Sequence, residues 1–123
     1  MISSHQSLVK TYSDPDYLKN LLDLEQDPTC DIDIERIYVE KTLEHIFEIH
    51  GKNFNKTPDI CAVLYNYTCD QIEHIFVIEI KSSFSAGNLK DARIQMQKYI
   101  DTIDSYLQEK EITYSGIIIL DFY

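Results

Sequence analysis

The sequence lacks several features that mark particular classes of protein. It has no tryptophan, only three glycines and three prolines, and no long uninterrupted apolar run. A membrane-spanning helix needs about 20 consecutive apolar residues, so we expect no membrane segment. Residues 1–6 also lack the basic and then apolar pattern of a secretory signal. With 44% hydrophobic residues and few chain breakers, we expect a single folded domain over residues 1–123.

Cysteine and positive charge are also scarce. Cys30, Cys61 and Cys69 are an odd number without metal-type CxxC spacing, which favours a reducing, cytoplasmic location over a disulfide framework. The chain has 11 basic and 21 acidic residues and a net charge of −10, so on average it repels nucleic acid. Most of this excess lies in residues 1–50, which hold 11 acids and four bases. The C-terminal half therefore remains compatible with a polyanionic partner.

Two helices are predicted in the N-terminal part. Residues 13–18 read as a helix start, because they combine a capping side chain, a proline for the first turn and early acids. A second helix is predicted over residues 34–50, closed by Gly51. Its apolar stripe at helical spacing consists of Val39, Leu43, Ile46, Phe47 and His50. We expect residues 1–33 to form a helical extension and residues 34–123 to form the core.

The apolar pattern then changes to that of buried strands. Residues 60–65 and 74–81 are nearly continuous apolar runs separated by polar residues, which predicts an antiparallel hairpin. A third helix is predicted over residues 89–109, and a last buried strand over residues 115–122. A helix between two buried strands indicates a crossover that leaves the strands parallel. We therefore expect an α/β (α+β) fold.

Three charged residues stand at the ends of the predicted hairpin strands. Glu79 and Lys81 share one face of an otherwise apolar strand, where burial is costly unless each is paired or bound. Asp59 opens the preceding strand, so antiparallel pairing brings it to the same end of the sheet as Glu79. Two carboxylates that close repel each other unless a cation lies between them. The ordinary alternatives are a strand end that emerges into solvent and an aspartate that caps a turn.

These residues resemble a known signature. Asp59 after its proline, then a hairpin, then Glu79 and Lys81 in the form ExK, are similar to the motif of the PD-(D/E)xK nuclease superfamily. The resemblance covers roughly residues 35–122. It implies a restriction-endonuclease-like core, with a central mixed sheet of three to four strands flanked by helices. The expected order is helix, helix, a very short or absent strand at residues 52–57, strand, strand, helix, strand.

Two further elements extend the resemblance. Gln95 and Tyr99, one turn apart on the third helix, resemble the QxxxY element of the RecB-like branch, which implies that they steady Lys81 or the substrate backbone. An upstream helix with a glutamate is also part of the family pattern, and Glu40 or Glu44 fills that place. Glu40 is preferred because it lies nearer the apolar stripe.

The resemblance implies a metal-dependent reaction. Asp59 and Glu79 would bind one Mg²⁺ or Mn²⁺, with the Ile80 carbonyl as a further ligand, and Glu40 would contact a second metal or a metal-bound water. Lys81 would position or help to deprotonate an attacking water and offset charge on the phosphate. The implied activity is a nuclease, with DNA favoured over RNA because RecB-like members mostly act on DNA. The alternative is a catalytically silent nuclease-fold domain whose acidic surface binds a protein partner; a homodimer is a further possible assembly.

Overall fold

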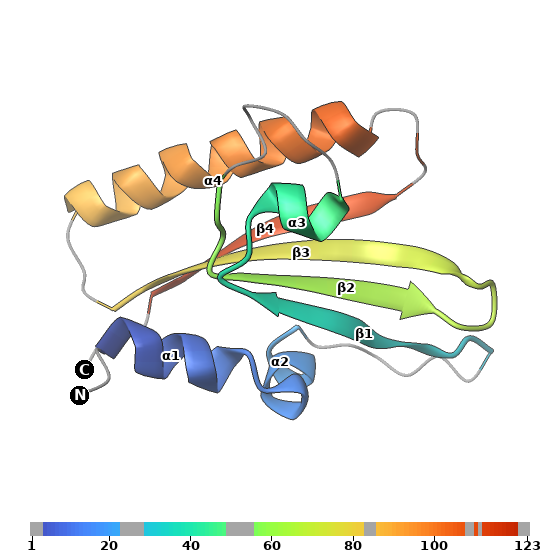
Figure 1. Cartoon of the computed structure of the whole chain (residues 1–123). Helices are drawn as coiled ribbons and strands as arrows, with labels where there is room; N and C mark the ends of the chain where they lie inside the picture. Colours follow the sequence, from blue (N-terminus) through green and yellow to red (C-terminus); the bar gives the residue numbers. More distant parts are fainter. Residues whose placement is uncertain are drawn as a thin grey trace.

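The computed structural model describes residues 4–22, 29–48, 56–82, 86–107, 110 and 112–120. These residues form an α+β fold, in which a four-stranded mixed sheet carries helices on both faces (Figure 1). The first three strands in sheet order form an antiparallel meander, and the fourth pairs parallel with the third. The strands are β1 (Ile32–Val39), β2 (Ile60–Asn66), β3 (Gln71–Lys81) and β4 (Thr113–Leu120). The expected mixed sheet with a crossover is confirmed.

Helices form a layer on each side of the sheet (Figure 1). One layer holds α1 (Ser4–Tyr12) and α2 (Pro15–Leu21), and the other holds α3 (Leu43–Phe47) and α4 (Ala86–Leu107). The predicted start of α2 is confirmed, because Asp14 caps it by accepting a hydrogen bond from the Tyr17 N–H at 3.0 Å. None of the described helices is both long and apolar enough to cross a membrane.

The α1–α2 layer shares one hydrophobic core with the sheet. Its side chains pack on the inward-facing residues of β2, β3 and β4, and the buried members of this core are Leu8, Val9, Tyr12, Leu18, Ile60, Ala62, Ile78, Ile80 and Ile119. The sequence pattern does not predict α1, because only a few of its nine residues are apolar. The boundary expected between residues 33 and 34 falls inside β1.

The helix predicted over residues 34–50 is wrong in its first half, which is β1. The register of β1 against β2 shifts between Ile34 and Arg36, so a β-bulge interrupts the alternation. Ile34 and Ile37 consequently pack on the same core at a spacing of three, which imitates a helix. Only α3 remains of the predicted helix, begun by Thr42, whose side chain accepts from the His45 N–H at 3.1 Å. The expected closure at Gly51 lies outside the described residues.

The second core lies between the sheet and the α3–α4 layer. Its buried members are Leu43, Ile46, Cys61, Ile75, Val77, Met96, Tyr99, Ile103 and Leu107. Helix α4 lies close to β4 at Gly116. A Cβ atom added to this glycine would lie 2.6 Å from the Met96 sulfur. The predicted helix over residues 89–109 and the predicted last strand match α4 and β4 apart from their ends. This packing holds the N-terminal half of α4 beside the end of β3 (Figure 1).

Candidate functional site

The candidate acidic residues meet at one end of the sheet. Ile60 pairs with Ile78, which places Asp59, just before β2, beside Glu79 near the end of β3. The Asp59 N–H donates to Oε1 of Glu79 at 3.0 Å. The Ile80 N–H donates to Oδ2 of Asp59 at 2.8 Å. The structure therefore brings these two residues together, as the hairpin predicts.

Glu79 is a buried carboxylate close to a second negative charge, that of Asp59. Its exposure is only 4%. Its pKa is raised above the ordinary value, first because burial disfavours the charged form and second because Asp59 is negatively charged. Its hydrogen bonds and the nearby Lys81 ammonium act in the opposite direction. A cation bound beside Glu79 would act in the same direction as these groups and favour the charged form.

Lys81 lies two residues beyond Glu79 on the same face of β3, and it is half-buried. Within the described part of the chain, no carboxylate lies within ion-pair distance of its ammonium group. Its positive charge still acts on Glu79, whose pKa it lowers. Lys81 is therefore close to the acidic pair without being neutralised by it.

Gln95 and Tyr99 form a hydrogen-bonded pair on α4, as their spacing predicts. The Gln95 amide donates to the Tyr99 hydroxyl at 2.7 Å, and this hydroxyl donates to the Thr57 carbonyl at 3.0 Å. The pKa of Tyr99 is raised by its burial and by the nearby Glu79. Because the hydroxyl has a single proton, it donates either to Thr57 or to Glu79. The pair therefore holds the segment that leads into Asp59.

Glu40 lies on the turn that follows β1 and not on a helix, so its predicted helical placement is wrong. Its φ of 51° is in the left-handed region, which is uncommon for a residue with a side chain. Its N–H donates to the Asp59 carbonyl at 3.0 Å, and its side chain is exposed. The backbone of Glu40 is thus attached to the site. A metal-binding role for its carboxylate, for Glu44 on α3 and for the Ile80 carbonyl stays a prediction.

His5 is a site residue that the sequence reasoning missed. Its Nε2 lies 3.2 Å from Oδ2 of Asp59, and the two residues are 54 positions apart in the chain. No short motif reports a contact over that distance. The available signal is the spacing of three, four and seven from His5 to the apolar residues Leu8, Val9 and Tyr12, which places all four on one side of α1.

The side chains at this end of the sheet are of types that can bind a hard divalent cation. Two carboxylates and an imidazole belong to one hydrogen-bonded cluster. Mg²⁺ and Mn²⁺ prefer carboxylate oxygen, and Mn²⁺ also accepts imidazole. Within the described ranges, however, no three His, Cys, Asp or Glu side chains are arranged as a ready metal site. The groups are connected but do not converge on one point.

Comparison with known proteins adds no family. No protein-family model matches the sequence, and no curated protein and no solved structure matches it.

Proposed function

We propose that the protein is a divalent-metal-dependent nuclease that hydrolyses phosphodiester bonds at this end of the sheet, with DNA favoured over RNA. One observation carries the proposal. The Asp59 N–H donates to the Glu79 carboxylate at 3.0 Å, the Ile80 N–H donates to the Asp59 carboxylate at 2.8 Å, and Lys81 lies on the same face of β3 as Glu79. Two close carboxylates beside an unneutralised lysine are suited to holding a cation next to a phosphate.

The order of elements supports membership of the PD-(D/E)xK superfamily and a restriction-endonuclease-like core. The family pattern places a strand between the upstream helix and the Pro-Asp strand. On this proposal β1 would correspond to that strand and α1 to the upstream helix, with α2 and α3 as additions before and after β1. His5 on α1 would then correspond to the helical glutamate of the family pattern.

In the proposed reaction, Asp59 and Glu79 would hold Mg²⁺ or Mn²⁺, assisted by His5, the Ile80 carbonyl and Glu40. When bound, the cation polarises the phosphoryl oxygen and neutralises part of its charge. Lys81 donates hydrogen bonds to the phosphate and orients the attacking water. Gln95 and Tyr99 position the segment at Thr57 and thereby Asp59.

A second function is favoured by the net charge of −10. A nuclease-fold domain that has lost activity would present this acidic surface to a basic protein partner.

The three cysteines are all free, and we propose a reducing, cytoplasmic location for either function.

The test is to incubate the protein with single-stranded and double-stranded DNA and RNA in Mn²⁺, with parallel reactions in EDTA. Lys81→Ala is the site variant. Lys110→Ala, an exposed lysine beyond the C-terminal end of α4, is the matched control. We expect cleavage that requires Mn²⁺, persists in Lys110→Ala and is lost in Lys81→Ala. If Mn²⁺ supports no cleavage of any substrate, or if Lys81→Ala cuts as fast as the wild type, the nuclease proposal is wrong.

A further inference from the structure

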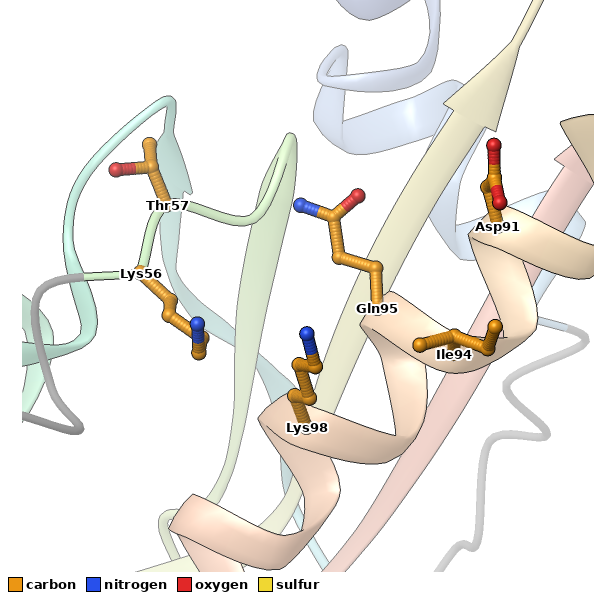
Figure 2. A pocket seen from close by; sticks show the side chains of 6 residues that line it. All are labelled: Lys56, Thr57, Asp91, Ile94, Gln95 and Lys98. Carbon is orange, nitrogen blue, oxygen red and sulfur yellow. The ribbon is translucent and has the colours of Figure 1, made fainter.

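A pocket of about 440 Å³ lies beside the candidate site, between α4 and the segment that enters β2 (Figure 2). Its six lining residues are Lys56, Thr57, Asp91, Ile94, Gln95 and Lys98. This volume is within the range of sites that bind small ligands or single groups of a larger one. Its walls come from parts of the chain about 40 residues apart in sequence, so folding creates it.

The pocket is locally positive in an acidic protein. Figure 2 shows Lys56 and Lys98 extending from the two walls toward the same space. Asp91 is the one acidic residue among the described residues that line the pocket. The net charge of this lining is therefore positive, whereas the net charge of the whole chain is −10. Because the rest of the acidic surface repels anions, we expect an anion to bind preferentially at this pocket.

The wall that carries Lys56 is anchored through two of its backbone carbonyls, each of which accepts a hydrogen bond. The Leu43 N–H donates to the Lys56 carbonyl at 2.9 Å, and the Thr57 carbonyl accepts from Tyr99 at 3.0 Å. Leu43 and Tyr99 are both fully buried. The Lys56 backbone is therefore held in place before anything binds, which lowers the entropic cost of binding.

The pocket also adjoins the candidate catalytic residues. Thr57 lies two positions before Asp59, and Gln95 belongs to the hydrogen-bonded pair that contacts Thr57. Ile94, which is 47% exposed, adds an apolar surface to the wall. An occupant with an anionic group and an apolar face, continuous with a group at Asp59, matches a nucleotide of a polynucleotide strand.

We infer that this pocket binds a nucleotide of a single-stranded substrate next to the phosphodiester that is cut. Lys56 and Lys98 hold its phosphate, and Ile94 packs against its sugar or base. The inference rests on the nuclease function proposed above and adds to it a path for the substrate strand. A single strand is the expected form, because one unpaired nucleotide enters a concave pocket that the convex backbone of a duplex does not fill.

The experiment measures binding of fluorescein-labelled dT15 by fluorescence anisotropy in EDTA, at several NaCl concentrations. The pocket variant is Lys56→Gln/Lys98→Gln. The control, Lys10→Gln/Lys90→Gln, removes the same charge from exposed lysines on α1 and α4 that do not line the pocket. We expect binding about tenfold weaker for the pocket variant, and a salt slope smaller by about 1.4, or about 0.7 per lysine. The control stays within about twofold of the wild type.

A gain of affinity provides a second test that misfolding cannot imitate. Asp91→Asn removes the one acid among the described residues that line the pocket and should tighten dT15 binding, whereas Asp16→Asn on α2 should not. The inference is overturned if the wild type does not bind dT15, if both lysine double variants weaken binding equally, or if a labelled poly-glutamate peptide binds as well as dT15.

The two proposals fail separately. If no metal-dependent cleavage occurs but dT15 binding depends on Lys56 and Lys98, the pocket stands and the nuclease function is wrong. If Mn²⁺-dependent cleavage occurs and the KM for single-stranded substrate is unchanged in Lys56→Gln/Lys98→Gln, the nuclease function stands and the pocket inference is wrong.

Discussion

Tyr99→Phe removes one hydroxyl from the centre of the candidate site. The ring has 0% exposure, and the hydroxyl makes two hydrogen bonds, at 3.0 Å to Thr57 and 2.7 Å from Gln95. A hydrogen bond contributes about 0.5–1.5 kcal/mol net, so the pair contributes about 1–3 kcal/mol. Because Thr57 and Gln95 are exposed and regain water, we expect the free energy of unfolding to fall by about 1–2 kcal/mol.

The assay is urea unfolding followed by circular dichroism, together with Mn²⁺-dependent cleavage. The matched control is Tyr65→Phe, which removes a hydroxyl bonded to Asp70 at 2.6 Å at the opposite end of the sheet. That change at the surface should cost less than about 0.5 kcal/mol and leave cleavage unaltered. Tyr99→Phe should lower both the stability and the rate of cleavage, because the lost hydrogen bond to Thr57 holds the segment that leads into Asp59. A Tyr99→Phe protein as stable as the wild type, or a Tyr65→Phe protein destabilised equally, refutes the reasoning.

Three further changes have defined outcomes. Gly116→Val forces a methyl-bearing side chain against Met96, where even a Cβ would lie at 2.6 Å, and should lower the free energy of urea unfolding by about 1–3 kcal/mol. The pKa of Glu79 is raised in the folded state, so without metal the wild type loses stability as pH rises from the ordinary value of 4.5 through the raised pKa. Glu79→Gln should remove that part of the loss above pH 4.5, and an unchanged pH profile would contradict the burial of a charged Glu79. His5→Ala deletes the imidazole 3.2 Å from Asp59 and should weaken Mn²⁺ binding about 10–100-fold in a calorimetric titration, whereas equal affinity would remove His5 from the site.

The sequence predicts the sheet end well, because its signals there are local. Continuous apolar runs mark β2 and β3, and antiparallel pairing alone places Asp59 beside Glu79. Gln95 and Tyr99 share a helix face by spacing, and their hydrogen bond follows. In each case the relevant neighbours are joined by one turn of helix or one hairpin.

The features that the sequence did not predict depend on contacts between residues that are far apart in the chain. The bulge between Ile34 and Arg36 gives a strand the spacing of a helix, and only pairing with β2 determines which structure forms. The contact of His5 with Asp59 depends on the packing of α1 across the sheet, which no local pattern reports. The pocket likewise requires Lys56 and Lys98 to meet through tertiary structure.

In the proposed nuclease, Asp59 and Glu79 together bind the divalent cation. Electron paramagnetic resonance of Mn²⁺ measures this directly, because the signal of free Mn²⁺ decreases as the ion binds. We expect the wild type and Lys81→Ala to bind Mn²⁺, and Asp59→Asn and Glu79→Gln to lose that binding, while Glu35→Gln, an exposed acid on β1, retains it. A wild type that leaves Mn²⁺ free, or an Asp59→Asn protein that binds it equally well, would contradict the central claim.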